Sequence, residues 1–240
     1  VYLRGLGPGT LGLEAMRRIG FPWSPELVER SVRSCGGTIA AARVAMQRGS
    51  GCYLAGGTHH ARADRGAGYC VYNDCAVAAR ILQHEARARR VLIVDTDVHQ
   101  GDGTAAIFAV DPTVFTFSVH GEENFPAAKA QSDLDLALPT GTGDEAYLSC
   151  LRDGLAEALA RSEPDFVFYL SGADPFVGDK LGRLALTKSG LRARDEFVLG
   201  ELVRLGLPHV TVMGGGYGRV IEDSVDIYEA TVRTAVHLVE

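Results

Sequence analysis

The sequence predicts an α/β fold in which helices flank a central, mostly parallel β-sheet. Short runs of β-branched and aromatic residues alternate along the chain with longer stretches of helical spacing. Several short runs are apolar almost throughout, which is typical of strands covered on both faces. The 240 residues are enough for one well-buried core, and we find no linker or repeat. We therefore expect a single domain over residues 1–240.

The elements follow in order from these patterns. Apolar, β-branched runs predict strands at residues 52–55, 91–98, 114–120, 166–171 and 209–213. Helical spacing between them predicts helices at residues 25–47, 73–85, 145–161, 188–205 and 220–239. Thr187 and Ser189 are suitable residues to begin the fourth helix, and Gly206 followed by Pro208 is a suitable end.

Composition excludes several classes of protein. The net charge of -6 and the lack of a Lys/Arg block argue against direct binding to nucleic acid. The five cysteines are odd in number and form no CxxC pair, so we expect reduced thiols and a cytoplasmic, intracellular location. No apolar run reaches membrane-spanning length, and the N-terminus lacks the pattern of a signal peptide. The chain begins abruptly, so we expect that an N-terminal segment is missing.

Polar residues gather where the expected strands end. The motif GGTHH follows the first strand, DTDVHQGDG ends the second, SGAD ends the fourth, and MGGGYG ends the fifth. Open α/β folds bind their ligands at the carboxyl ends of the strands, so these four motifs are expected to meet. Taken alone, each motif is explained more simply as a turn, a helix cap or a solvated loop than as a functional site. Their recurrence in order at neighbouring strand ends favours a shared site.

A metal site is the chemistry that these residue types suggest. Asp97 and His99 are two positions apart, so in an extended chain both side chains point to the same side. Asp174 is the best candidate for a third ligand, because two carboxylates and an imidazole suit zinc and leave one position open for water or substrate. The adjacent His59 and His60 then remain for proton transfer.

These segments resemble a known superfamily. GGTHHARADRGAGYCVYND, VDTDVHQGDG, YLSGADPFVGDKLG and VMGGGYG are similar, in this order, to four signature segments of the histone deacetylase and acetylpolyamine amidohydrolase superfamily. The resemblance extends from about Gly20 to the C-terminus. HQGDG, ADPFVGDKLGRLALT and GFPWSPELVERS make it most similar to the class IV branch. It implies a three-layer arginase/deacetylase-like fold and a zinc-dependent hydrolase that removes an acetyl or longer acyl group from an amine nitrogen.

The resemblance also implies two kinds of bound ion. The zinc, one per chain with ferrous iron as the alternative, would be bound by Asp97, His99 and Asp174. A structural K⁺ or Na⁺ would lie behind it, held by Asp95, Asp97, His99, Ser118 and Val119.

Catalytic roles follow from the same resemblance. His59 and His60 would transfer protons, each oriented by an aspartate, Asp95 and Asp102 respectively, and His60 would be the main general base and acid. Tyr217 would donate its hydroxyl to the substrate carbonyl oxygen.

Substrate contacts are implied at Gly68 and Tyr69, which match positions lining the tube that admits the acylated side chain, although Tyr69 is equally compatible with a core aromatic. The sequence departs from the family at two points. Gln100 replaces the second histidine of the common family pattern, which is not a zinc ligand, so the chemistry should survive. The N-terminal region with its rim loop, which family members usually carry, is expected to be missing before Val1. The class IV resemblance and the small residues 66–68 favour long acyl chains.

Several alternatives remain open. The substrate is either an acyl-lysine in a protein or peptide, or a small acylated amine such as an acetylpolyamine. Arginase-like chemistry would need a second metal and more aspartate ligands. A non-catalytic binding module would be expected to have lost one of the site residues, and none is missing. The sequence indicates no oligomeric state.

Overall fold

Six parallel strands form one sheet in this computed structural model, which describes residues 2–238. Their order across the sheet is β1-β6-β5-β2-β3-β4. The strands are β1 (Ser50–Tyr53), β2 (Val91–Asp95), β3 (Val114–Gly121), β4 (Leu134–Leu138), β5 (Phe166–Ser171) and β6 (His209–Met213). Because all neighbours are parallel, all carboxyl ends lie at one edge of the sheet, where α/β folds bind ligands.

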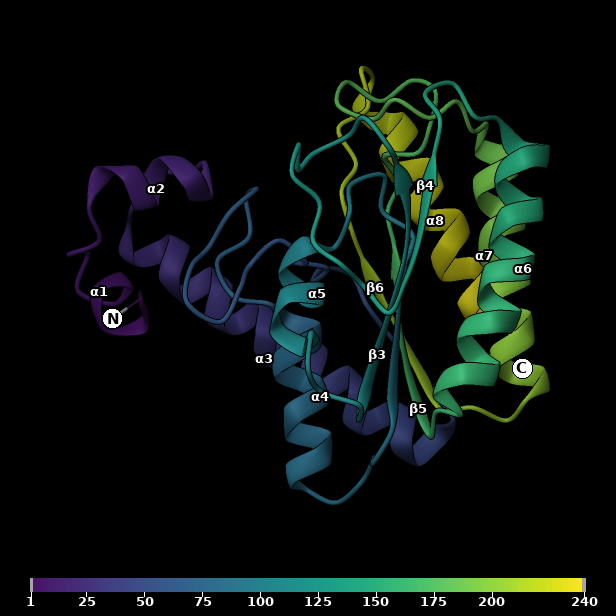
Figure 1. The fold of residues 1–240 in the computed structure, drawn as a ribbon, viewed down its shortest axis with the longest axis horizontal. Coiled ribbons are helices and arrows are strands. Elements are labelled where there is room, and N and C mark those ends of the chain that lie inside the picture. Colours follow the sequence, from purple (N-terminus) through teal and green to yellow (C-terminus); the bar gives the residue numbers. More distant parts are fainter. Residues whose placement is uncertain (1, 239–240) are drawn as a thin grey trace.

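Helices cover both faces of the sheet (Figure 1). One layer contains α3 (Pro25–Arg48), α4 (Asp74–His84) and α5 (Asp102–Phe108), and the other contains α6 (Asp144–Ser162), α7 (Lys188–Arg204) and α8 (Ile221–His237). Two short helices, α1 (Tyr2–Leu6) and α2 (Leu13–Ile19), lie beside the first layer and pack with the start of α3. The three-layer α/β fold predicted from the sequence is confirmed.

The central strands contribute to two separate cores. Along β2, Leu92 and Val94 pack against α6, α7 and α8, whereas Val91 and Ile93 pack against the α3–α5 layer. Strand β5 alternates in the same way, with Phe168 in the second core. Both faces of these strands are therefore buried, which explains why they are continuously apolar in sequence.

Helix boundaries follow local capping. The Thr187 side chain accepts a hydrogen bond from Gly190 N at the start of α7, as the sequence predicts, and Ser24 caps α3 ahead of a proline. Helix α7 ends at Arg204, and Gly206 follows in the left-handed region at a φ of 65°.

The structure corrects several boundaries. Strand β1 lies two residues before the expected 52–55, and β2 ends at Asp95 instead of residue 98. Strand β4 and helices α1, α2 and α5 were not predicted, because each is short and β4 is an edge strand whose LDLAL sequence is only partly buried. Residue 239 of the expected last helix lies outside the described residues. Within residues 2–238, no helix combines the length and apolarity needed to cross a membrane.

Candidate active site and metal centre

Asp97, His99 and Asp174 converge at the carboxyl edge of the sheet. One ligand atom from each side chain lies within 4.8 Å of the others. His99 Nδ1 is 2.9 Å from Asp97 Oδ1 and 3.2 Å from Asp174 Oδ2. The expected reason for this grouping was wrong, because β2 ends at Asp95 and the Asp97–His99 segment is a loop. The side chains meet because this loop turns toward the end of the adjacent strand β5.

The cluster has the charge and the free acceptor that a divalent cation requires. Asp97 and Asp174 are almost completely inaccessible to solvent, and burial together with the charge of Asp97 raises the pKa of Asp174. Burial lowers the pKa of His99, but the two carboxylates outweigh it and raise this pKa to about 11. Asp174 Oδ2 accepts no hydrogen bond within the described chain. Two buried carboxylates and an imidazole therefore fit zinc with a position left open.

Backbone groups hold the two carboxylates in place. Gly215 N donates to Asp97 Oδ2 at 2.5 Å, and Val98 N donates to Asp174 Oδ1 at 2.8 Å. A Cβ on Gly215 would lie 2.0 Å from Asp174 Oδ2, so only glycine allows the backbone this close to the cluster. The glycine run of the MGGGYG motif is thus part of the candidate metal centre.

The tandem histidines lie next to this cluster, and each contacts a carboxylate. His59 Nδ1 is 2.7 Å from Asp95 Oδ2, and His60 Nδ1 is 2.7 Å from Asp102 Oδ1. The two rings are 4.1 Å apart. Burial and the neighbouring His59 lower the pKa of His60 to about 4. Burial opposes protonation of His59, but Asp95 and Asp97 outweigh it and raise its pKa to about 9. The pair therefore divides into a charged and a neutral imidazole.

Two residues that the sequence analysis did not single out hold the loop of residues 57–61, which carries the tandem histidines. Asn73 Nδ2 donates to the backbone oxygens of His59 and Ala61 at 3.4 and 3.2 Å, and Asn73 Oδ1 caps α4. The buried carboxylate of Asp74 accepts hydrogen bonds from Thr58 N at 2.8 Å and Thr58 Oγ1 at 2.7 Å. The sequence pattern predicts only the start of a helix at these two residues.

A cavity of about 660 Å³ opens over the cluster and the histidines. Tyr69 and Tyr217 line it with their rings 6.0 Å apart, and Tyr69 is 46% exposed, so it is a wall residue and not a core aromatic. A Cβ on Gly68, whose φ is 52°, would lie 2.4 Å from the His60 ring. Tyr217 N donates to Asp179 Oδ2 at 2.6 Å, and burial raises the pKa of the Tyr217 hydroxyl, which stays protonated at neutral pH.

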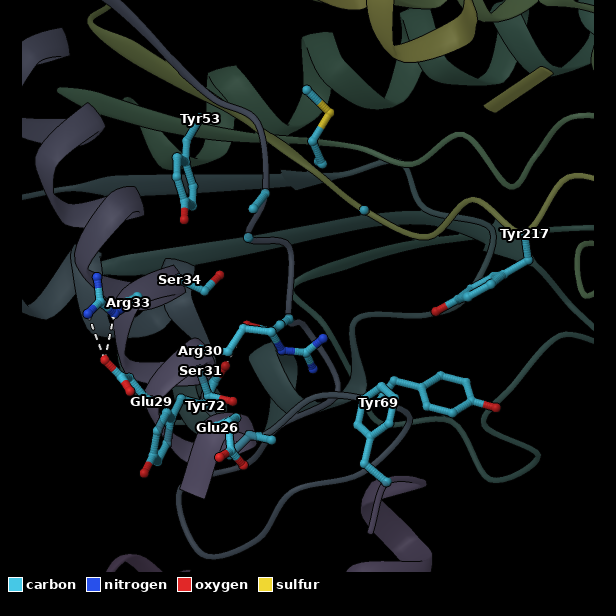
Figure 2. A pocket seen from close by; sticks show the side chains of 17 residues that line it. Glu26, Glu29, Arg30, Ser31, Arg33, Ser34, Tyr53, Tyr69, Tyr72 and Tyr217 are labelled. Atoms are coloured by element: carbon cyan, nitrogen blue, oxygen red, sulfur yellow. Dashed lines mark hydrogen bonds and ion pairs between the residues drawn. The ribbon is translucent and has the colours of Figure 1, made fainter. Parts of the chain in front are cut away.

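A second cavity, of about 630 Å³, lies on the other side of the two tyrosines, against α3 (Figure 2). Figure 2 shows Tyr217 with its hydroxyl pointing toward this cavity and Tyr53 on the far side. An ion pair between Arg33 and Glu29 on α3 borders it. The two cavities share Tyr69 and Tyr217, so these rings separate the space above the metal centre from the space along α3.

The remaining predicted positions lie nearby. Ser118 is the register partner of Asp95 in the adjacent strand β3, and Val119 follows it. Residues predicted to bind the monovalent cation therefore lie on neighbouring strands, and the cation site itself stays a prediction. Gln100, which replaces the second histidine of the family pattern, accepts a hydrogen bond from Ala130 N through its Oε1 at 2.8 Å. Gln100 thus ties two loops together.

Arg194 is a fully buried arginine behind the metal centre. Its Nη1 donates to Gly172 O at 2.6 Å and contacts Thr96 O at 3.4 Å, and its Nε donates to Asp195 at 2.9 Å. Thr96 precedes the candidate ligand Asp97, and Gly172 is two residues before Asp174. One guanidinium therefore ties together the two segments that carry the carboxylates. An adjacent Arg-Asp pair in a helical pattern usually indicates a solvated face, so no sequence pattern points to a buried role for Arg194.

We expect Arg194→Met to lower the free energy of unfolding by about 3–5 kcal/mol, because it leaves the buried Asp195 carboxylate without its cation. Arg192→Met, on the same helix, removes an exposed ion pair with Glu196 and should cost less than about 1 kcal/mol. Urea unfolding of the metal-free variants would measure both. An equal loss in the two variants would contradict the role given to Arg194.

The chain is similar in sequence to a known protein family and to several curated proteins. The family model for the histone deacetylase domain matches residues 12–233. An uncharacterized protein of Picosynechococcus sp. is 50% identical over 224 residues, covering 93% of this chain and 75% of the relative. Histone deacetylase 2 of Arabidopsis thaliana is 33% identical over 201 residues, covering 81% of this chain and 52% of the relative. The acetoin utilization protein AcuC of Staphylococcus aureus is 32% identical, covering 70% and 46%.

Solved structures agree with these matches. An acetylpolyamine aminohydrolase from Burkholderia pseudomallei superposes with a TM-score of 0.74 at 28% identity, covering 85% of this chain and 62% of that one. The HD domain of HDA15 superposes with a TM-score of 0.72 at 27% identity, with the same coverage. The chain thus spans about half the length of two of the curated relatives that it matches.

Proposed function

The chain belongs to the histone deacetylase family, and from this premise we propose that it is a zinc-dependent hydrolase of N-acylated amines. One observation carries the proposal. Asp97 and His99, which form a cluster with Asp174, border one cavity together with Tyr217 and the imidazoles of two histidine–aspartate pairs. A metal centre with an open position beside a neutral imidazole is the arrangement that amide hydrolysis requires.

Proton transfer is the part of the reaction that His60 supplies. A zinc ion bound by the three ligands would polarise the amide carbonyl and make water acidic enough to attack. His60 is neutral at working pH, so it accepts the proton of the attacking water and returns it to the nitrogen of the leaving amine. Asp102, 2.7 Å from His60 Nδ1, holds the ring in the orientation that this transfer needs.

Charge stabilisation is the part that Tyr217 and His59 supply. The Tyr217 hydroxyl stays protonated and donates to the carbonyl oxygen as negative charge develops there. His59, charged beside Asp95, adds a fixed positive charge next to the reacting atoms. The two histidines are held by buried contacts with Asp95 and Asp102, so their rings need no rearrangement when the substrate arrives.

The direct test is zinc binding and turnover by the whole chain. We expect about one zinc per chain by elemental analysis and release of carboxylate from a fluorogenic acetyl-lysine peptide, with ferrous iron as the alternative metal. A chelator should stop hydrolysis, and added zinc should restore it. A chain that binds zinc or iron but cleaves no acyl-lysine or acetylpolyamine would support the non-catalytic module instead.

Finer assignments stay predictions. They include the class IV branch, the preference for long acyl chains that it implies, the monovalent cation, the single catalytic domain over residues 1–240 and the intracellular location. All five cysteines are unpaired in the structure, and their reduced state in the cell stays a prediction.

A further inference from the structure

The mouth of the metal cavity has a charge opposite in sign to the protein as a whole. The chain has a net charge of -6. Outside the metal cluster and the histidines, the charged side chains lining this cavity within residues 2–238 are Arg17, Arg18, Arg183 and Glu123. Three arginines thus face one glutamate around the entrance.

The two arginines of α2 are fixed next to the path of the substrate. Gly68 N donates to Arg18 O at 3.1 Å, and Tyr69 N donates to Ile19 O at 2.8 Å. The last turn of α2, which carries Arg17 and Arg18, is therefore hydrogen-bonded to the two residues that form the cavity wall above His60. These bonds fix the backbone that carries the two arginines beside the entrance.

Little nearby charge offsets these arginines. Arg17 has no hydrogen-bond or ion-pair partner in the part of the chain that the structure describes. Arg18 pairs at 3.4 Å with Glu14, which is 94% exposed, so solvent screens this pair strongly. The one glutamate of the mouth, Glu123, is already paired with Arg183 at 2.8 Å and also accepts from Thr140. The positive charge of α2 is therefore available to a ligand.

We infer that the substrate carries an anionic group close to its acylated amine and that Arg17 and Arg18 select it. This inference rests on the proposed function and narrows its substrate class. A polyamine chain or a lysine-rich tail would bring positive charge to the same arginines, and like charges at an entrance disfavour binding and slow association. An acyl-lysine flanked by aspartate or glutamate is the substrate that this mouth fits.

The test compares acetyl-lysine peptides of equal length with acidic, neutral or basic flanks, together with N-acetylputrescine. The full, zinc-loaded chain should hydrolyse the acidic peptide with a kcat/KM about 10-fold above that of the basic one, and rising salt should reduce this ratio. In Arg17→Glu/Arg18→Glu the order of the two peptides should reverse. The matched control is Arg48→Glu/Arg89→Glu, which makes the same change in net charge just before β1 and β2, at the opposite edge of the sheet, and should keep the wild-type order.

Dissociation constants of the labelled peptides separate failure of this inference from failure of the proposed function. If wild type cleaves all peptides equally well, or prefers basic flanks or the polyamine, the selection by Arg17 and Arg18 is wrong and the hydrolase stands. If no peptide is cleaved but the acidic peptide still binds most tightly and the double variant reverses the order, the anionic site stands and the hydrolase is wrong. Equal binding without cleavage overturns both.

Discussion

Asp174→Asn should abolish zinc binding and, with it, hydrolysis. The variant keeps the size of the side chain and an oxygen that can still accept from Val98 N, but it loses the anionic ligand. Loss of a group that only orients a ligand already costs 10- to 100-fold in metal affinity, so loss of the ligand should cost more than about 100-fold. Zinc titration against a competing chelator measures this effect, and turnover should fall in parallel.

Unfolding cannot explain the expected loss of zinc. Burial and the charge of Asp97 raise the pKa of Asp174, which means that the ionised carboxylate is unfavourable in the metal-free protein. The neutral asparagine should therefore leave the metal-free Tm unchanged or raise it. The exposed Asp153 on α6 provides the control, because Asp153→Asn should retain zinc and activity. Wild-type zinc affinity in Asp174→Asn would remove Asp174 from the ligand set.

His60→Ala should keep the zinc and lose turnover. His60 lies 2.7 Å from Asp102 and does not belong to the cluster of metal ligands, so its loss removes proton transfer alone. General acid–base catalysis contributes about 10²- to 10⁴-fold, and we expect kcat to fall by that amount. Zinc content and kcat measured on one preparation test both halves of the statement. His84→Ala, at the exposed end of α4, is the matched control and should be as active as wild type.

The pH profile provides a second readout for His60. Protonated His60 cannot accept a proton, so kcat/KM should fall as the pH drops toward the pKa of this residue. Burial and His59 lower that pKa to about 4, which places the acid limb well below the pH at which an ordinary histidine titrates. The residual activity of His60→Ala should lack this limb. If it kept the limb at the same pH, the base would be another group.

Much of the architecture could be read from the sequence because buried parallel strands are continuously apolar. Strand β2, which ends at Asp95, and strand β5, which precedes Asp174, were predicted for this reason. The grouping of Asp97 with His99 was also expected, but for a reason that the structure corrects. The residue types predicted the grouping of Asp97 and His99 correctly, whereas the assumed extended backbone was wrong, because a loop brings the two side chains together.

The supporting contacts could not be read in this way. Asn73, Asp74 and Arg194 make their hydrogen bonds to backbone atoms of segments 12 to 98 residues away, and a partner of this kind leaves no periodic signal. The edge strand β4 was missed because Asp135 and its neighbours are only half buried. Local pattern thus predicts the layers and the chemistry of the site, whereas the contacts that fix its geometry depend on distant parts of the chain.

The anchoring of the histidine loop by the start of α4 bears on how binding energy is used. The loop from Gly57 to Ala61 is held at both ends by side chains of one helical turn, so it is already ordered before any substrate binds. Ordering a flexible loop at the moment of binding would consume conformational entropy that the contacts with substrate would have to offset. A preorganised loop avoids this cost. More of the interaction energy with the substrate then remains available to lower the barrier of the chemical step.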